Sequence, residues 1–321
     1  MCSIFAYITT IYSDMQNNLI VVTGPTATGK TKFAVDLAIQ TKAEIISADS
    51  RQVFRGMDLG TGKDLTEYSS NGITIPYHLI DILDPGQKYS VYRFQKDFFS
   101  TYDIIKNTGK NVILCGGTGL YIESVVKNYQ MPDVPANEPL RKSLENKSLE
   151  ELASILSKLK IMHNSTDIDT PKRAIRAIEI ATFEKNNSIK NDYPKLNSLI
   201  FGLHYERAEI RKRITQRLKQ RIDEGMIDET NNLLKLGIDP DVLISYGLEY
   251  KYTTWFLQNK ISQKQFFEEL NTAIHQFAKR QVTWFRRMER SGIKIHWIDG
   301  ALSASEKLNK AKEIMGLCGY L

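Results

Sequence analysis

Apolar and polar positions in the first 127 residues follow two alternating patterns. Short, mostly apolar runs predict buried strands at 18–23, 44–47, 78–84 and 111–115. Between and after them, apolar residues recur at helical spacing over 31–40, 90–106 and 120–126. Strands that alternate with helices in this way predict an α/β fold, with a parallel sheet and helices on its faces.

The pattern changes at residue 128. Three prolines fall between 128 and 139, and helical repeats follow at about 139–160 and 170–184 with no strand pattern among them. A clear apolar strand returns at 198–204. We therefore expect 128–197 to be a small helical domain inserted into a core that consists of 1–127 and 198–321.

Two long helices with many cations are predicted after the last strand. In 207–221, Ile210, Ile214 and Leu218 recur every four residues, and seven Lys or Arg accompany a single Glu. In 262–290, the residues expected to pack inward are Phe266, Leu270, Ile274, Phe277, Trp284 and Met288. Either helix alone fits a solvated surface, but the two together favour a nucleic-acid-binding surface.

The composition fits a soluble globular protein of 321 residues with a formal charge of +6. Its three widely spaced cysteines indicate neither disulfides nor a zinc site and favour a reducing cytoplasm. No apolar run is long enough to span a membrane. We expect 1–14 to be an extra strand or a leader, unless translation begins at Met15, and we expect a monomer.

Residues 24–31 read GPTATGKT and match the phosphate-loop pattern G-x-x-x-x-G-K-[ST] in full. The strand and the helix that this pattern requires are both predicted around it. In that setting backbone N–H groups face an anion, Lys30 reaches phosphate oxygens and the Thr31 hydroxyl can bind Mg²⁺. The expected phosphate-binding residues are Gly24, Pro25, Thr26, Ala27, Thr28, Gly29, Lys30 and Thr31. This pattern predicts a polyphosphate ligand but not the reaction.

Two further loops should meet the phosphate loop, because the carboxyl ends of parallel strands share one edge of a sheet. Asp49 follows the second strand; it could bind Mg²⁺ through water, accept a proton from an attacking group, or only form a turn. Thr118, which follows Gly116 and Gly117, could donate to a phosphate or only cap the next helix. The glycine-rich, basic stretch 51–63 is expected to contact a substrate.

The motifs GPTATGKT, SADSRQVFRGMDLGTGK, HLIDILDP, GGTGLY and KRQVTWFRR occur in an order that resembles the bacterial tRNA dimethylallyltransferase (tRNA isopentenyltransferase) family, from Leu19 to Ile298. The resemblance implies a P-loop NTPase-like fold. It also implies transfer of a dimethylallyl group from dimethylallyl diphosphate to the exocyclic N6 amine of the adenosine on the 3′ side of the anticodon in tRNA. In this family Mg²⁺ assists, and the phosphate loop holds the diphosphate of the prenyl donor rather than ATP.

The resemblance assigns roles as well. Asp49 matches the general base that accepts a proton from the amine, and Thr118 matches the donor to the departing diphosphate oxygen. Lys30, Mg²⁺ on Thr31 and a cation such as Arg207 are expected to stabilise the departing charge. The expected contacts to the tRNA anticodon stem-loop are Asp49, Ser50, Arg51, Gln52, Thr118, Arg141, Lys172, Arg173, Arg176, Lys279, Arg280, Gln281, Trp284 and Arg286, with 244–249 beside them.

One stretch departs from the family: 244–251 reads ISYGLEYK where Gly-Tyr-Lys or Gly-Tyr-Arg is usual. Three other interpretations are compatible with a phosphate loop. They are an adenylate isopentenyltransferase that acts on a free nucleotide, a P-loop kinase of a small metabolite, and a non-catalytic RNA-binding module. The two basic helices argue against the first, because that relative lacks the long helical region that binds tRNA.

Overall fold

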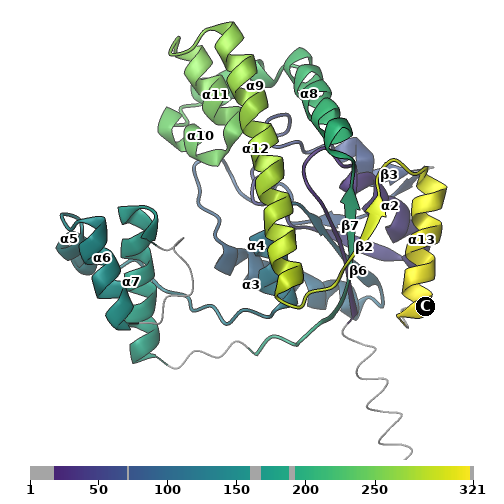
Figure 1. Cartoon of the computed structure of the whole chain (residues 1–321), viewed down its shortest axis with the longest axis horizontal. Coiled ribbons are helices and arrows are strands. Elements are labelled where there is room, and N and C mark those ends of the chain that lie inside the picture. The colour runs from purple at the N-terminus through teal and green to yellow at the C-terminus, as the bar shows by residue number, and fades with distance from the viewer. Residues whose placement is uncertain (1–17, 71, 160–167, 188–191, 319–321) are drawn as a thin grey trace, which may run out of the picture. The chain divides into compact units, whose positions relative to one another are not determined.

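The computed structural model describes residues 18–70, 72–159, 168–187 and 192–318. It divides the chain into one compact unit of residues 1–128 and 194–321 and a second of residues 129–193 (Figure 1). The expectation for 1–14 lies outside the described residues. Among the helices that are described, none is long and apolar enough to cross a membrane.

A six-stranded sheet forms the centre of the first unit, in the order β5-β2-β6-β1-β7-β8, and every neighbouring pair is parallel. The strands are β1 (Asn18–Thr23), β2 (Ala43–Ser47), β5 (Tyr77–His78), β6 (Asn111–Gly116), β7 (Asn197–His204) and β8 (Ile295–Asp299). Val21 of β1 lies between Leu114 of β6 and Ile200 of β7. The parallel α/β fold predicted from the sequence is therefore confirmed.

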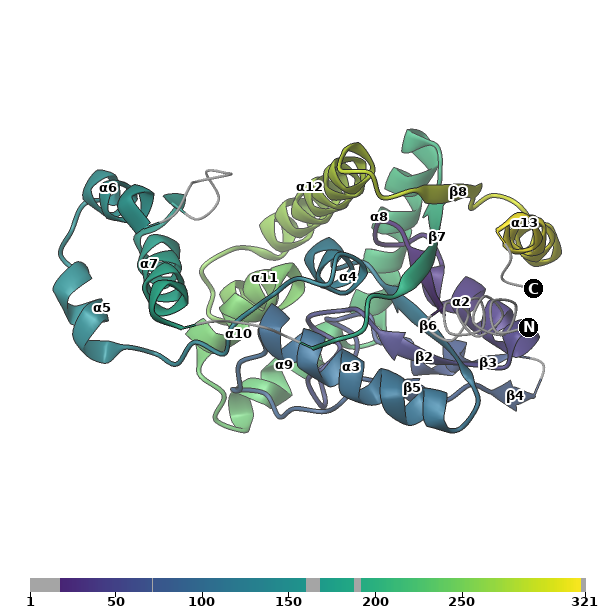
Figure 2. The same ribbon diagram turned by 90° about the horizontal axis from the view of Figure 1, so that it is seen from below.

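Helices cover both faces of this sheet (Figures 1 and 2). On one face lie α2 (Lys30–Thr41) and α13 (Ala304–Leu317). The other face carries α3 (Val91–Asn107), α4 (Gly119–Val126) and the carboxyl half of α12 (Gln263–Arg290). Strands buried on both sides need apolar residues at nearly every position, which explains why their runs are apolar without alternation.

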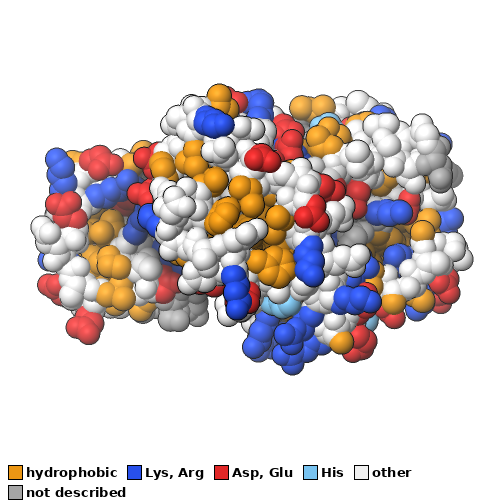
Figure 3. Space-filling model, turned by 90° about the horizontal axis from the view of Figure 1, so that it is seen from above, with side chains coloured by type: hydrophobic (Ala, Val, Ile, Leu, Met, Phe, Trp, Pro, Cys, Tyr) orange, Lys and Arg blue, Asp and Glu red, His pale blue; other side chains and the backbone are white. Residues whose placement is uncertain are grey.

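Further helices gather beyond the carboxyl ends of the strands, at the top of Figure 1. They are α8 (Arg207–Asp223), α9 (Met226–Lys235), α10 (Pro240–Tyr246) and α11 (Leu248–Leu257), and the amino half of α12 joins them. Ile214, Leu218, Phe266 and Leu270 form an apolar core that also takes in Ala27 of the phosphate loop. This group of helices therefore packs directly on the loop. Figure 3, which looks onto this end, shows apolar side chains in the middle of the face and a cluster of Lys and Arg side chains at its lower edge.

The second unit is a group of three helices, α5 (Glu138–Leu144), α6 (Leu149–Leu159) and α7 (Pro171–Asn186), around Leu144, Leu152 and Ile178. The helical pattern predicted at about 139–160 corresponds to two separate helices, α5 and α6. The reason is a new helix start: the Ser148 hydroxyl accepts from the Glu151 N–H, and the Glu151 carboxylate accepts from the Ser148 N–H.

The predicted strand at 78–84 was also mostly wrong. β5 ends at His78, and Leu79 and Asp81 adopt left-handed backbone conformations, with φ of +60° and +54°, that no strand accommodates. The Asp81 carboxylate forms an ion pair with the Lys63 ammonium. The prediction also lacked η1 (Leu65–Tyr68) and the hairpin strands β3 (Ser69–Ser70) and β4 (Ile73–Thr74). It lacked β8 as well, which follows the strand that was expected to be the last.

The inward face predicted for α12 needs a correction. Phe266, Leu270, Ile274 and Met288 are buried as expected, but Phe277 is 40 % exposed. Phe285, which lies two turns further along from Phe277, is completely buried instead and meets Trp297 of β8 edge to face. The buried stripe therefore shifts around this long helix as its neighbours change from α8 and α11 to α4 and β8.

Candidate active site

The phosphate loop leads from β1 into α2 with the geometry that its sequence predicts. Gly24 has a φ of +149°, and a side chain there would lie 2.5 Å from the Leu203 carbonyl oxygen of β7. Gly29 has a φ of +74° and immediately precedes α2. Both conformations favour glycine. The loop consequently wraps around the amino end of α2, where free N–H groups attract an anion.

Lys30 lies inside this loop. Its ammonium donates to the Pro25 carbonyl at 2.8 Å, and burial lowers the pKa of Lys30 to about 8, while Asp49 and Glu67 oppose that shift. An ammonium held in this way is poised to exchange one backbone carbonyl for phosphate oxygens. Anion binding would stabilise its charged form.

The loop opens into a cavity of about 1150 Å³ in the first unit, at the carboxyl end of the sheet. Many predicted site residues line it: Thr26, Ala27, Gly29, Lys30, Thr31, Asp49, Ser50, Arg51, Gln52, Thr118, Arg280, Gln281 and Trp284. Ile244–Glu249 line it too. Segments that lie far apart in the sequence are thus brought to one place by the strand ends and by α8, α11 and α12.

Asp49 both shapes its own loop and faces the cavity. One carboxylate oxygen, Oδ1, accepts from the N–H groups of Arg51 at 2.8 Å and Gln52 at 3.4 Å, as in an Asx turn. The turn-forming role considered from the sequence is therefore real. It fixes the carboxylate at the cavity wall, so it is compatible with a role as proton acceptor.

Thr118 joins the two strand-end loops. Its hydroxyl accepts from the Ser50 N–H at 3.2 Å, and its own N–H donates to the Ala48 carbonyl at 3.2 Å. Among the described residues, this hydroxyl makes no capping bond to α4. Because the Thr118 oxygen accepts from Ser50, its proton remains available for an acceptor in the cavity.

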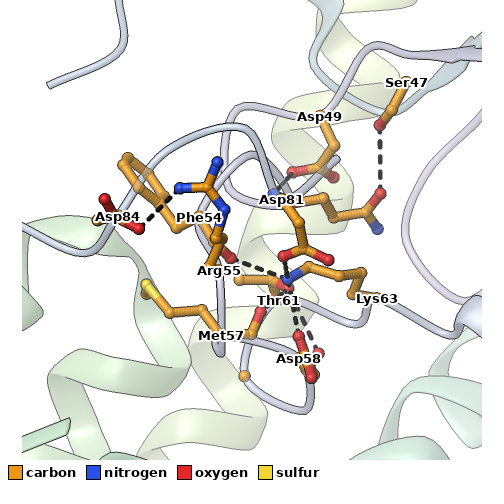
Figure 4. Close-up of polar contacts among 12 residues, drawn as sticks. Ser47, Asp49, Phe54, Arg55, Met57, Asp58, Thr61, Lys63, Asp81 and Asp84 are labelled. Atoms are coloured by element: carbon orange, nitrogen blue, oxygen red, sulfur yellow. Dashed lines mark hydrogen bonds and ion pairs between the residues drawn. The ribbon is translucent and has the colours of Figure 1, made fainter. Parts of the chain in front are cut away.

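The stretch 51–63 is anchored by a buried lysine (Figure 4). The Lys63 ammonium donates to the Phe54 carbonyl at 2.8 Å and to Asp58 at 2.7 Å, and it also contacts Asp81. The Lys63 side chain is completely buried. The expectation of a purely substrate-contacting loop was therefore too simple, because part of it belongs to the core.

A carboxylate from α9 secures the other end of this loop. Glu229 accepts from three successive backbone N–H groups, those of Asp58, Leu59 and Gly60, at 2.7 to 3.0 Å. The Tyr250 hydroxyl donates to the same carboxylate at 2.6 Å. As a result, residues 60–62 form a rigid part of the cavity wall.

Three arginines of α8 face the cavity, but Arg207, the α8 cation that was expected there, is not one of them. Arg207 is exposed at the first turn of the helix and is not among the described residues that line the cavity. Arg213 instead donates to the Ala27 carbonyl at 2.9 Å, and Arg217 donates to the Thr26 hydroxyl at 3.4 Å. Arg221 lines the cavity one turn further on. Spacing by four residues along α8 was the available signal for this row.

Two predicted tRNA contacts of α12 also hold the site together. Gln281 is buried; its carbonyl oxygen accepts from the Thr26 N–H at 2.8 Å, and its amide donates to the Gly117 carbonyl at 2.9 Å. Trp284 packs against Gly119 so closely that a side chain there would lie 2.2 Å from the ring. Gln281 is thus a brace between the two loops, and it also lines the cavity, so its contact with tRNA stays a prediction.

The other α12 cations differ in position. Arg280 is exposed and lines the cavity, whereas Lys279 and Arg286 are exposed and lie outside the described cavity wall. Arg287 pairs with Glu123 at 2.6 Å and stacks on Trp284 at 3.9 Å. Exposed cations beside a cavity mouth can bind phosphates of a large polyanion.

The predicted tRNA contacts of the second unit are partly engaged within that unit. Arg141 donates to the buried Glu179 carboxylate through Nε at 2.8 Å and Nη2 at 3.0 Å, and Arg176 donates to it at 3.0 Å. These bonds outweigh the burial of Glu179 and lower its pKa to about 2. Lys172 and Arg173 are exposed, and Arg173 pairs with Asp169.

One carboxylate at the phosphate loop had no sequence signal. Glu67 of η1 lines the cavity, and burial together with Asp64 raises its pKa, although Arg217 and a hydrogen bond from Thr31 act in the opposite direction. The Thr31 hydroxyl and a carboxylate therefore lie together. Mg²⁺ in such sites needs only one or two protein ligands beside phosphate oxygens and water, so these residues fit the ion.

Family models and individual relatives of the chain indicate the same family. A family model described as IPP transferase matches residues 52–288, and one described as isopentenyl transferase matches residues 17–77. The chain is 57 % identical over 297 residues to tRNA dimethylallyltransferase 2 of Bacteroides fragilis, covering 92 % of this chain and 97 % of that protein. It is 53 % identical over 302 residues to tRNA dimethylallyltransferase 2 of Porphyromonas gingivalis, covering 94 % of this chain and all of that protein.

Solved structures agree. The full-length tRNA isopentenylpyrophosphate transferase of Bacillus halodurans superimposes with a TM-score of 0.69 at 32 % identity, covering 94 % of this chain and 96 % of that one. A eukaryotic dimethylallyltransferase solved while acting on tRNA matches with a TM-score of 0.73 at 20 % identity, covering 93 % and 78 %. The second match bears on the fold alone.

Proposed function

The chain belongs to the tRNA dimethylallyltransferase (IPP transferase) family, and from this premise we propose that it transfers the dimethylallyl group of dimethylallyl diphosphate to the N6 amine of the adenosine that follows the anticodon in tRNA. It is a prenyl transferase that modifies tRNA. We propose further that it works in the cytoplasm as a monomer.

One observation carries the proposal. The phosphate loop, Asp49 and Thr118 line a single cavity, so an anion cradle and a proton acceptor lie within reach of one pair of reacting molecules. A kinase would place a nucleoside triphosphate in the same loop. The cavity is also lined by Ile274, Phe277 and Trp284, which suit an isoprenoid chain better than a second polar substrate.

The reaction breaks the bond between C1 of the dimethylallyl group and a diphosphate oxygen, and it forms a bond between C1 and N6. The departing oxygens gain negative charge. The N–H groups of the phosphate loop, the Lys30 ammonium and the guanidinium groups of Arg213 and Arg217 are positioned to stabilise that charge, and the Thr118 hydroxyl can donate to the oxygen released.

The nitrogen has the opposite requirement. The lone pair of an adenine amine is delocalised into the ring, so the nitrogen becomes acidic as it bonds to carbon and must lose a proton. We assign this proton to the Asp49 carboxylate, which the Asx turn holds in place at the cavity wall.

Mg²⁺ would be held by the Thr31 hydroxyl, and Glu67 could bind a water of the ion. When bound, it neutralises charge on the diphosphate oxygens. Lys30 and Arg217 bring two positive charges to the same place from this chain itself.

The tRNA is proposed to approach from the α12 side. Arg280 stands exposed at the cavity, and the base must leave its stack to reach Asp49. Ser50, Arg51, Gln52 and Thr118 line the same cavity, in agreement with contacts to the flipped nucleotide. Lys172 and Arg173 on α7 and Lys279 and Arg286 on α12 remain proposed phosphate contacts.

A transfer assay tests the function. The protein is incubated with labelled dimethylallyl diphosphate, Mg²⁺ and either unmodified tRNA or AMP, and separately with ATP and small alcohols. Label in tRNA at the adenosine beside the anticodon is expected. Label in AMP would instead favour a nucleotide prenyltransferase, phosphoryl transfer from ATP would favour a kinase, and tRNA binding without transfer would favour a binding module.

Asp49→Ala tests the proton acceptor. Turnover should fall by a factor of about a hundred or more while tRNA binding persists, because general base catalysis contributes on that order. Asp103→Ala removes an exposed aspartate of α3 and should leave turnover unchanged. Equal rates for the two variants would remove Asp49 from the mechanism.

A further inference from the structure

Beyond Arg217, the row of arginines on α8 ends in a buried guanidinium with an unused donor. Arg221 is 7 % exposed, and its Nη2 is buried without a hydrogen-bond partner among the described residues. The nearest carboxylate oxygen that pairs with it, Asp64 Oδ2, lies 3.7 Å away, beyond hydrogen-bonding distance. Leaving a buried donor of a charged group without a partner costs free energy, so the unpaired Nη2 of Arg221 needs an explanation.

Gly62 leaves space for the guanidinium group of Arg221. The Nη2 atoms of Arg221 and Arg217 lie against Gly62, where a side chain would be only 2.1 Å and 2.6 Å from them. Gly62 also has a φ of +70°, which favours glycine. Two like charges are thus held side by side against one rigid part of the cavity wall.

The acids nearby offset this charge only in part. Asp64 bonds to Arg217 at 3.0 Å and is 42 % exposed. Burial and Arg217 lower the pKa of Arg221 to about 10, while Asp64 and Glu249 counteract this. Burial raises the pKa of Glu249 despite the nearby arginines. Asp64 therefore serves Arg217, while Nη2 of Arg221 still lacks a hydrogen-bond partner among the described residues.

The location of Arg221 also supports a role in ligand binding. Arg217, Arg221 and Glu249 line a small pocket together with Thr26 and Ala27 of the phosphate loop, and the same residues line the large cavity. Glu249 stands immediately before Tyr250 and Lys251, where ISYGLEYK departs from the family's Gly-Tyr-Lys. The buried arginine and the departing segment consequently meet at one point.

We propose that Arg221, beside Arg217 and over Gly62, forms a second phosphate-binding position next to the phosphate loop. Its ligand is a phosphate oxygen, contributed either by the diphosphate of the prenyl donor or by the backbone of the tRNA. Glu249 balances the charge of Arg221 before the phosphate arrives. This inference rests on the proposed function for the identity of the two substrates, but not for the existence of the anion position.

Binding measurements without any transfer step test it. Arg221→Gln is titrated with inorganic diphosphate and Mg²⁺, and separately with unmodified tRNA at several salt concentrations. Affinity for one ligand should fall about tenfold or more, as for loss of a charge-assisted hydrogen bond, while the other stays within about twofold. Loss of diphosphate affinity identifies the donor as the source; loss of tRNA affinity with a flatter salt dependence identifies the tRNA backbone.

Controls keep the test decisive. Lys212→Gln removes an exposed cation of the same helix and should leave diphosphate affinity unchanged. If Arg221→Gln lowers the melting temperature so far that binding cannot be measured, Arg221→Lys, which keeps the charge, takes its place and should show an intermediate loss. The proposal is overturned if neither affinity changes in the folded variant, or if both fall equally. Label transfer by the unaltered protein checks the proposed function independently.

Discussion

The two basic helices α8 and α12 look alike in sequence but differ in what their charges face. On α8, Arg213, Arg217 and Arg221 turn toward the cavity, and two of them bond to the phosphate loop. On α12, Gln281 and Trp284 turn inward and Arg280 is exposed but lines the cavity, while Lys279 and Arg286 are exposed outside the described cavity wall. One helix lines the proposed anion site, and the other braces its loops and presents charge to the outside.

This difference shows that the number of Lys and Arg residues on a helix does not predict what those side chains contact. The three α8 arginines at the cavity are partly or largely buried, and two of them, Arg213 and Arg217, donate to backbone carbonyls, which suits a compact ligand such as a diphosphate. Lys279, Arg280 and Arg286 of α12 are exposed, as contact with an extended polyanion requires, and such binding depends strongly on salt. We expect variants of the two helices to separate along this line.

The largest effect is expected for Arg217→Ala. It removes a guanidinium beside the phosphate loop, so kcat/KM for dimethylallyl diphosphate should fall about a hundredfold, as for other stabilisers of transition-state charge. Affinity for tRNA should stay within about twofold. Steady-state kinetics with each substrate varied in turn, using Lys212→Ala as the matched control, measures both. A loss confined to tRNA affinity would reverse the assignment of α8.

A smaller effect is expected from pH. Lys30 has a pKa lowered to about 8 in the free protein, so it loses its charge as the pH rises through 8, and bound diphosphate would favour the charged form. The value of kcat/KM for the donor should therefore decline above pH 8, by up to about tenfold per pH unit. Binding of tRNA through arginines should not decline. The same profile in Lys30→Arg should lack the decline; a decline of equal size in that variant would contradict this origin.

Arg280→Ala should have a more modest effect of the opposite kind. The loss of one phosphate contact on the α12 side should weaken tRNA binding several-fold and reduce the slope of log Kd against log salt by about one. The KM for dimethylallyl diphosphate should not change. Filter binding at four or more salt concentrations measures the slope. An unaltered slope would mean that this arginine touches no phosphate.

The smallest effect on activity is expected for Glu179→Gln in the second unit, where Arg141 and Arg176 are already paired; this variant should change stability instead. Glu179, which binds Arg141 and Arg176, has a folded pKa of about 2 against an ordinary 4.5. Its folded pKa is depressed, so its stabilising contribution is complete above pH 4.5 and is lost as the pH falls through 2. Glu179→Gln should lower the stability of the second unit at pH 7 but narrow the difference from the unaltered protein toward pH 2. Thermal unfolding followed across this range measures it, and a constant difference would contradict the pKa.

Much of the fold followed from the sequence because buried parallel strands leave strong apolar runs. β1, β2, β6 and β7 were predicted to within about one or two residues. The strand at 78–84 failed because a contact distant in sequence, between Lys63 and Asp81, overrides the local pattern. The helix start at Ser148 was missed because its capping bonds are set by side chains rather than by apolar spacing.

The site was predictable where it rests on backbone geometry and unpredictable where it rests on how distant helices pack together. The phosphate loop and the strand-end loops of Asp49 and Thr118 meet in one cavity because parallel strands all end at one edge. The four-residue spacing predicted the buried face of α8, with Ile214 and Leu218, but not that this face packs against α12 beside the phosphate loop. That packing puts Arg217 at the phosphate loop and leaves Arg207 outside the described cavity wall.

The phosphate loop is proposed to bind the diphosphate of the prenyl donor. A crystal structure of the protein with Mg²⁺, the unreactive thio-analogue of dimethylallyl diphosphate and an equal concentration of ATP tests it most directly. We predict the analogue's diphosphate within hydrogen-bonding distance of the Lys30 ammonium and the loop N–H groups, with its C1 facing Asp49. ATP phosphates in the loop, with the analogue elsewhere, would contradict the account.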